Sequence, residues 1–313
     1  MSYIIGSFNL QNLSENTAVK RSKDFKEIAR IIRKEKFDII ALQEVLSEMA
    51  IEQLVQSLGR NKWESVFLQP ESYGGKSEGY AYIWNKNRIK LVEDDNNPMI
   101  YNKHRTVHQF GTRGQGLVRP PLVARFEPAE RATPFIEFRL INTHITFGKS
   151  KNYTGDLDDK ELRRKEYEIL TQDVYRLIST KGYGNNRTSF TILLGDYNLC
   201  LTSNGPKIDS TVKVSLAYNK SLVTVQDKKT TLKMKNEPGD EYFANDYDHF
   251  TFDECYLEKT FIKYDRVNAV EHFHNNDIEL YRTKISDHVP IKLLIDFKTR
   301  GRRVIPWNIQ ESN

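Results

Sequence analysis

The chain contains 313 residues, of which 38% are hydrophobic and 28% charged, with 16 Phe and 16 Tyr. These proportions supply enough side chains for a large hydrophobic core, and they exclude a fibrous protein or one that is disordered throughout. No window approaches the ~18 uninterrupted apolar residues of a membrane span, and the first residues lack the features of a signal peptide. We therefore expect a cytoplasmic protein that does not act at a membrane. Its two cysteines, Cys200 and Cys255, match no metal-ligand spacing, and we expect both to be buried, reduced thiols.

The net charge of +5 comes from 47 Lys and Arg against 42 Asp and Glu, which mildly favours a polyanionic partner. The positive charge is concentrated in three places, one of which is a group of four arginines, Arg105, Arg113, Arg119 and Arg125. The segment from Lys207 to Lys235 contains seven lysines and two aspartates, and residues 298–313 form a basic C-terminal tail. For each of them, both a binding surface and a solvated surface are open interpretations.

Apolar periodicity in the first hundred residues predicts strands and helices in alternation. Strands are marked by continuous apolar runs or by alternation, as in Tyr80, Tyr82 and Trp84, which we expect to share one packed face. Helices are marked by apolar residues that recur every three or four positions. In chain order, the predicted elements are a strand at 3–9, a helix at about 20–34, a strand at 37–44, a helix at about 50–58, and strands at 63–68 and 79–84.

The rest of the chain is predicted to contain further strands and one long helix. The helix spans about 158–179, with Leu170, Val174, Leu177 and Ile178 on its inner face. The predicted strands are, in chain order, 117–126, 135–143, 188–194, 249–252 and 289–297.

Many strands with few helices between them indicate two β-sheets packed face to face with helices outside. The sequence has no Gly/Ser/Pro-rich linker, no internal repeat and no low-complexity tract. We therefore expect a single domain over residues 1–297, followed by the basic tail. The irregular segment 202–242 is expected to form loops and short elements.

Polar side chains stand where the predicted strands begin or end. Any one of them alone is typical of a cap or turn residue. Together they indicate more, because adjacent strands bring their ends to one rim, where loops receive the side chains. Five of them follow strands and two immediately precede the last strand; in chain order they are Asn9, Glu44, His144, Asp196, Asn198, Asp287 and His288.

The residue types restrict the chemistry of this rim. Carboxylate and amide oxygens without cysteine suit a hard divalent cation, Mg²⁺ or Mn²⁺ before Zn²⁺. Histidines suit proton transfer. Phosphodiester hydrolysis needs an activated water, a neutralised oxyanion and a protonated leaving oxygen, and this set of residues provides for all three.

These residues, with Asp248, lie within six short segments that follow one another along nearly the whole chain. The segments are FNLQN (8–12), LQEV (42–45), NTH (142–144), GDYN (195–198), YDH (247–249) and SDHVP (286–290). In order and spacing they resemble the endonuclease/exonuclease/phosphatase superfamily. Two further segments, SEGYAY (77–82) and VRPPLV (118–123), are similar to those that supply a second glutamate and a phosphate-contacting arginine in its deoxyribonuclease-like branch.

The resemblance implies a fold and an activity. The fold is of the α+β class, a four-layer α/β/β/α sandwich of two packed mixed β-sheets with helices outside. The activity is divalent-metal-dependent hydrolysis of a phosphodiester by in-line attack of an activated water molecule. The expected cofactor is Mg²⁺, with Mn²⁺ as the second option.

Metal and phosphate ligands are also implied by the resemblance. Glu44 is the expected principal metal ligand, helped by Asn9 and Asp287. Asp196 and Asn198 are expected to orient water and phosphate oxygens or to hold a second metal. Asn9 and Asn198 are further expected to contact the substrate phosphate.

Proton transfer is assigned in the same way. His288, oriented by Asp248, is expected on the side of the attacking water, and His144, oriented by Glu78, on the side of the leaving group. Arg119 is expected to hold a non-bridging phosphate oxygen with its planar guanidinium. Which histidine is the base and which the acid stays open.

The substrate needs a separate argument, because the superfamily hydrolyses several kinds of phosphate ester. The Glu78 and Arg119 segments, the lysine-rich segment and the net positive charge favour a nuclease, a deoxyribonuclease-like endonuclease that binds DNA or, as a second option, RNA. Leu46 departs from the pattern, because deoxyribonucleases of the family place a groove-reading arginine there. The alternative is a phosphatase or phosphodiesterase acting on a small or lipid phosphate ester. A protein that only binds nucleic acid is disfavoured, since all the acidic residues are retained.

Overall fold

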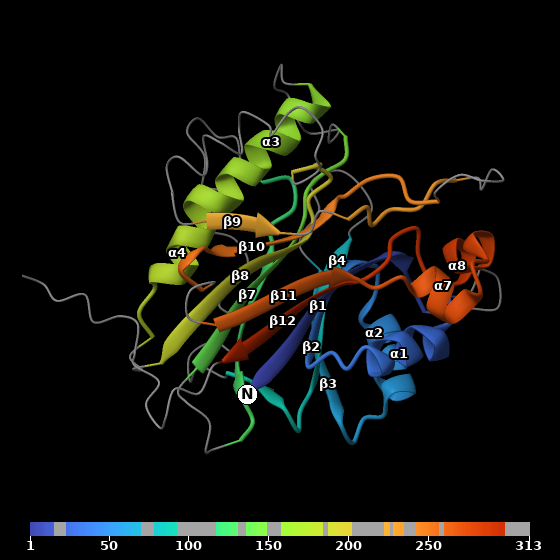
Figure 1. Ribbon diagram of the computed structural model, residues 1–313, viewed down its shortest axis with the longest axis horizontal. Helices are drawn as coiled ribbons and strands as arrows, with labels where there is room; N and C mark the ends of the chain where they lie inside the picture. Colours follow the sequence, from blue (N-terminus) through green and yellow to red (C-terminus); the bar gives the residue numbers. More distant parts are fainter. Residues whose placement is uncertain are drawn as a thin grey trace, which may run out of the picture.

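The computed structural model describes residues 1–15, 23–69, 78–92, 117–130, 136–148, 158–183, 187–201, 222–225, 228–234, 242–256 and 260–297. Within these ranges, two mixed six-stranded β-sheets pack face to face, and helices cover their outer sides (Figure 1). The predicted α/β/β/α sandwich is therefore confirmed. None of the helices in this part of the chain is long and apolar enough to cross a membrane.

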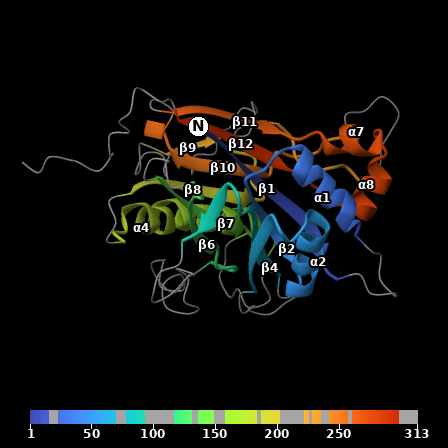
Figure 2. The same cartoon turned by 90° about the horizontal axis from the view of Figure 1, so that it is seen from below.

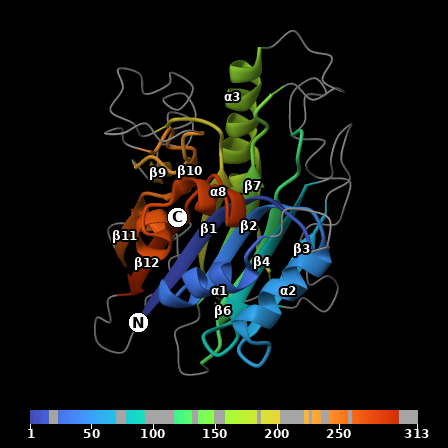
Figure 3. The same ribbon diagram turned by 90° about the vertical axis from the view of Figure 1, so that its right-hand side faces the viewer.

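The first sheet contains both ends of the described chain. Its strands are β1 (Ser2–Leu13), β2 (Ile39–Val45), β3 (Trp63–Leu68), β4 (Gly79–Asn85), β11 (Thr260–Arg266) and β12 (Ile291–Phe297). Their order across the sheet is β11-β12-β1-β2-β4-β3, and β1 pairs with β2 in parallel and with β12 antiparallel. The helices on the same side of the molecule are α1 (Phe25–Lys34), α2 (Glu48–Leu58), α7 (Ala269–His274) and α8 (Ile278–Lys284) (Figures 2 and 3).

The second sheet is built from the middle of the chain. Its strands are β5 (Ile89–Leu91), β6 (Leu122–Pro128), β7 (Ile136–His144), β8 (Thr188–Asp196), β9 (Leu222–Val225) and β10 (Asp248–Asp253). Their order is β5-β6-β7-β8-β10-β9, with β7 and β8 parallel. The helical segment on its outer face consists of α3 (Asp159–Ile169), a π-helical turn (Leu170–Val174) and α4 (Tyr175–Thr180).

Three clusters of buried side chains hold these layers together. One lies between the sheets and contains residues from both, including Ile5 and Leu140. It also contains Tyr80, Tyr82 and Trp84, so the predicted packed face of that strand is confirmed. The other two clusters join each sheet to its own helices. Because alternate residues of a strand point to opposite sides, each central strand contributes to two clusters.

Two predictions of side-chain burial are wrong, and the strand predicted at 117–126 begins only at Leu122. Leu177 was expected inside, but it is 39% exposed, because the π-helical turn changes the phase of the helical segment before α4. Cys200 is exposed and Cys255 partly exposed, since Cys200 lies in the loop that follows β8, where the chain leaves the core.

Three short or half-exposed strands were not predicted. These are β5, β9 and β11, which lie at sheet edges, where a single paired neighbour leaves little apolar pattern in the sequence. In the irregular segment 202–242 the structure describes β9 and residues 228–234. The tail 298–313 and the lysines from Lys207 to Lys220, with Lys235, lie outside the described residues.

Candidate active site

The inner faces of the central strands change from apolar to polar toward one end of the sandwich. On β1, Ile5 belongs to the core between the sheets, whereas the next residues on that face, Ser7 and Asn9, are buried polar groups. On β7 and β8 the same alternation ends in His144 and Asp196, both buried. The alternation of side chains along the strands thus places these residues at one rim, at the same end of the sandwich.

Strand register then sets which of them are neighbours. The parallel pairing of β7 and β8 places His144 beside Asp196, and the antiparallel pairing of β8 and β10 places Asp248 beside Asp196 on its other side. His288 precedes β12 and joins them through its contacts with Asp248 and Asp196. The structure therefore brings together four residues that are far apart in the sequence.

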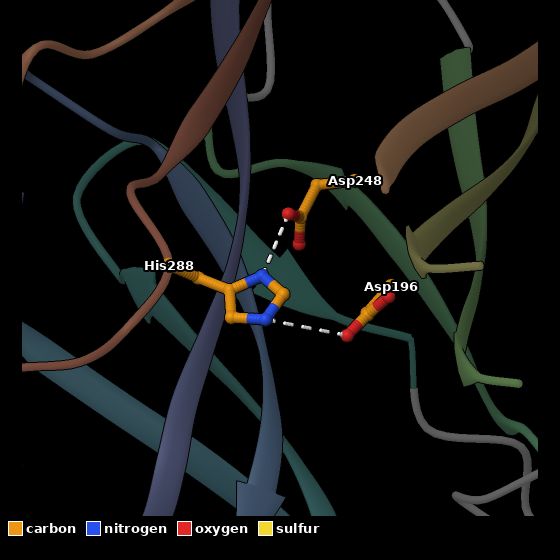
Figure 4. Close-up of side chains that lie close together, drawn as sticks. All are labelled: Asp196, Asp248 and His288. Atoms are coloured by element: carbon orange, nitrogen blue, oxygen red, sulfur yellow. Dashed lines mark hydrogen bonds and ion pairs between the residues drawn. The ribbon is translucent and has the colours of Figure 1, made fainter. Parts of the chain in front are cut away.

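His288 lies between two carboxylates (Figure 4). Its Nδ1 atom lies 2.8 Å from Asp248 Oδ2, and its Nε2 atom lies 3.6 Å from Asp196 Oδ2. The Thr230 hydroxyl donates to the same Asp248 oxygen at 2.6 Å. Burial disfavours the charged ring, but the carboxylates of Asp248 and Asp196 outweigh it and raise the pKa of His288 to about 10. Without a bound cation, this ring is charged at neutral pH.

The loop that carries His288 is fixed by hydrogen bonds from several directions. The Ser286 hydroxyl donates to the backbone oxygen of Asn9 at 2.7 Å and accepts from the His288 amide at 3.0 Å. The Tyr281 hydroxyl donates to the His288 backbone oxygen at 3.1 Å. Thr230 and Tyr281 were missed by sequence reasoning, because neither lies in a segment that carries the resemblance.

A second imidazole lies on the opposite side of Asp196. His144 Nε2 is 3.7 Å from Asp196 Oδ2, and His144 Nδ1 is 3.2 Å from Glu78 Oε2. The same Glu78 oxygen lies 3.1 Å from Arg119 Nη2, and Arg119 Nη1 donates to the His144 backbone oxygen at 3.4 Å. The Tyr80 hydroxyl accepts from the His144 amide. Glu78 thus lies near both the ring, as expected from the sequence, and the guanidinium of Arg119, a contact that was not predicted.

Glu44 occupies a bulge at the end of β2. Its φ is +55°, an uncommon value for a residue other than glycine, and the pairing of β2 with β4 shifts between Leu42 and Val45. Its carboxylate accepts from Asn9 Nδ2 at 2.9 Å and from the Asn12 amide at 3.1 Å. Backbone strain of this kind is concentrated at functional sites, where it directs a side chain.

Asn9 connects Glu44 to Asp196. Its Nδ2 atom also donates to Asp196 Oδ2 at 3.0 Å, and its Oδ1 atom accepts from the Gln11 amide at 2.9 Å. In this orientation Asn9 presents its amide nitrogen to both carboxylates. Its role as a metal ligand therefore stays a prediction.

Two other predicted residues lie at the same rim. Asn198 Nδ2 donates to the backbone oxygen of Ile145, and the Asn198 backbone amide donates to Asp196 Oδ1, so Asn198 links the loops after β7 and β8. Asp287 Oδ1 lies 4.0 Å from His288 Nε2, and its other oxygen lies 3.9 Å from Arg282 Nη2. The rim therefore contains every residue that the sequence assigned to the site.

The carboxylates of this rim fit a hard divalent cation. Asp196, Asp248 and His288 offer ligand atoms that lie within 4.8 Å of one another, and buried Asp248 Oδ1 has no hydrogen-bond partner. The ligand set expected from the sequence is different, because it centres on Glu44 and Asp287. The set around Glu44 and Asp287 stays a prediction. Asp248 Oδ2 and His288 Nδ1 already lie within hydrogen-bond distance of each other, and Mg²⁺ prefers oxygen ligands.

Comparison with known proteins identifies the family. The family model described as "Endonuclease/Exonuclease/phosphatase family" matches residues 6–288. The chain belongs to this family. No curated protein matches it in sequence.

Solved structures of this family share the fold at low sequence identity. A mannosyl-6-phosphatase of Bacteroides thetaiotaomicron, Bt3783, has a TM-score of 0.56 at 15% identity, covering 94% of this chain and 100% of its own. TDP2 of D. rerio, solved with a single strand DNA product, has the same TM-score and identity, covering 94% and 99%. Truncated TDP2 of Caenorhabditis elegans has a TM-score of 0.52 at 15% identity, covering 94% and 98%. At these identities the similarity shows the fold alone.

The contact between Glu78 and His144 leads to a prediction about coupled losses. His144→Ala should cost nearly as much kcat as the double variant with Glu78→Gln, because a carboxylate that orients an imidazole has little left to orient once the ring is gone. Steady-state kinetics of the two single variants and the double variant measure this coupling. Independent, multiplicative losses would show that Glu78 acts mainly through Arg119.

Proposed function

We propose that this chain is a divalent-metal-dependent phosphodiesterase that cleaves nucleic acid, DNA before RNA, by in-line attack of an activated water molecule. The observation that carries the proposal is the placement of two imidazoles on either side of Asp196. His288 Nε2 and His144 Nε2 lie 3.6 and 3.7 Å from the same carboxylate oxygen. Each ring also has a second carboxylate near Nδ1, with Asp248 Oδ2 at 2.8 Å from His288 and Glu78 Oε2 at 3.2 Å from His144.

In-line displacement at phosphorus needs groups on opposite sides of the reacting atom, one for the attacking water and one for the leaving oxygen. We assign His288, oriented by Asp248, to the water and His144, oriented by Glu78, to the leaving oxygen. Burial lowers the pKa of His288, but the carboxylates of Asp248 and Asp196 raise it further; a cation bound beside Asp196 would lower it again and favour the neutral ring that a base requires. Arg119, adjacent to His144, is placed to hold a non-bridging oxygen.

A metal would be held by Glu44 and Asp287, with Asp196 and Asn9 as further candidates. When bound, it neutralises phosphoryl charge and lowers the pKa of water. The protein's own contribution is the fixed geometry around it. Glu44 is directed by its bulge, and the loop of Asp287 is tied to β1 through Ser286.

Nucleic acid is the proposed substrate because of the charge around this rim. Lys229 and Lys233 each lie two residues from Thr231, whose bridge to His288 puts this segment beside the catalytic ring. The ammonium of Lys228, in the same segment, pairs with Asp265 at 2.6 Å. The net positive charge of the chain and Arg119 also favour a polyanionic substrate.

The proposal is tested with purified protein and four substrates: supercoiled plasmid, single-stranded DNA, RNA and a panel of phosphomonoesters, each with Mg²⁺. We expect cleavage of a polynucleotide and weak turnover of monoesters. Turnover restricted to a sugar phosphate or another monoester would establish the alternative, a phosphatase, and would contradict the nuclease proposal.

The lysines predict a salt dependence. Replacing Lys229 and Lys233 together by Gln should flatten the dependence of log(kcat/KM) on log[salt] by up to about 2 units for a long duplex, if each lysine contacts one phosphate. Hydrolysis of a small diester should not change. The matched control is Lys86→Gln with Lys90→Gln, because Lys86 follows β4 at the end opposite Glu78. An unchanged slope in the first variant would show that these two lysines form a solvated surface and do not contact the substrate.

A further inference from the structure

One buried carboxylate outside the residues already discussed touches both segments that supply Arg119 and His144. Glu166 lies on α3 and is 2% exposed. One of its oxygens accepts from the backbone amide of Val118, the residue before Arg119. The other accepts at 2.9 Å from the amide of Thr146, two residues after His144. A single side chain thus joins the two segments.

Packing alone does not account for an acid at this position. Its neighbours on the inner face of α3 are apolar or aromatic, among them Leu162 and Tyr167, and an apolar residue there would avoid the cost of burying a charge. Burial does raise the pKa of Glu166, against the opposing effects of the two amides, Arg119 and His144. Its two hydrogen-bond donors lie in the segments that carry Arg119 and His144.

Hydrogen bonds fix the beginning of α3, the helix that carries Glu166. The side chain of Asp158 accepts from the amides of Lys160 and Glu161, and Glu161 returns a bond to the Asp158 amide. This capping box fixes the first turn of α3. Glu166 follows in the second turn, so its position is set by the helix and by the second sheet beneath it.

We propose that Glu166 is a positioning residue, which fixes the Arg119 guanidinium relative to the His144 ring by holding the Val118 and Thr146 amides to α3. This inference rests on the proposed function, since it concerns the phosphate-holding and leaving-group residues. Both carboxylate oxygens are needed, one for each segment. A glutamine offers only one oxygen, and its amide group would face one of the two N–H groups. Aspartate is one methylene shorter.

The test is a double-mutant cycle with Glu166→Gln and Arg119→Ala, followed by cleavage of a single-stranded oligonucleotide and of bis(p-nitrophenyl) phosphate. We expect Glu166→Gln alone to lower kcat about 10- to 100-fold with little change in KM, because small misplacements of catalytic groups have effects of this size. In the Arg119→Ala background the same change should cost much less, since one of its two targets is gone. A merely structural role would give the same fold-loss in both backgrounds.

A matched control and a second variant keep the outcome decisive. Glu168→Gln, on the same helix, removes a partly exposed ion pair with Lys165 and should leave kcat unchanged. If Glu166→Gln does not fold, the cycle is run with Glu166→Asp, which keeps the charge. Active wild type with equal losses in both backgrounds overturns the positioning role alone. A wild type that hydrolyses neither substrate overturns the proposed function and this inference with it.

Discussion

Replacing His288 by Ala is expected to lower kcat by about three to four orders of magnitude, while metal affinity stays close to that of the wild type. The size of the effect follows from the loss of a proton-transfer group that is fixed by a buried carboxylate. Asp248→Asn should cause a loss of the same order, because the ring then loses the acceptor that sets its orientation and tautomer. The double variant should be little worse than His288→Ala.

Folding must be separated from chemistry in this experiment. His288 and Asp248 are both buried, so removing the ring leaves a buried carboxylate whose charge is uncompensated. His288→Gln retains a hydrogen-bond donor at the site and serves as the control for stability. If circular dichroism shows a native fold and His288→Ala still turns over at more than about a tenth of the wild-type rate, the role given to His288 is wrong.

Gly195→Ala is expected to be the most destabilising single substitution near the site. A Cβ atom on Gly195 would lie 1.9 Å from the backbone oxygen of Thr143, the residue that faces it on β7. Its φ of +143° is also one that residues with a side chain rarely adopt. The added Cβ atom would clash with backbone, which cannot move aside as a flexible side chain can. The strands β7 and β8 must therefore separate next to the position where they place His144 and Asp196 side by side.

We expect this change to lower the free energy of unfolding by roughly 4 kcal/mol or more and to abolish activity. Urea denaturation measures the first and oligonucleotide cleavage the second. Gly182→Ala is the matched control, because a Cβ atom there meets no other atom within 4 Å, and it should change stability by less than about 0.5 kcal/mol. Equal stabilities of the two variants would contradict the close approach of the two strands.

The sequence is informative about the rim because alternation along a strand is a local property. Once Ile5 is known to face the other sheet, Asn9 must face it too, and the same logic predicts His144 on β7. Local patterns do not reveal partners across the fold. Thr230 reaches Asp248 only because residues 230–232 pair with residues 243–245, just before β10. Glu166 reaches Val118 and Thr146 only because α3 packs on the second sheet. Neither residue is distinctive in the sequence.

The central claim is that the rim hydrolyses phosphodiesters through a divalent cation held chiefly by Glu44. The most direct measurement is cleavage of a labelled oligonucleotide during a Mg²⁺ titration that starts from excess EDTA, for the wild type, Glu44→Gln and His288→Ala. The account predicts no cleavage in EDTA, saturable recovery with Mg²⁺, and a higher half-saturating Mg²⁺ concentration for Glu44→Gln but not for His288→Ala. Full turnover in excess EDTA would contradict it.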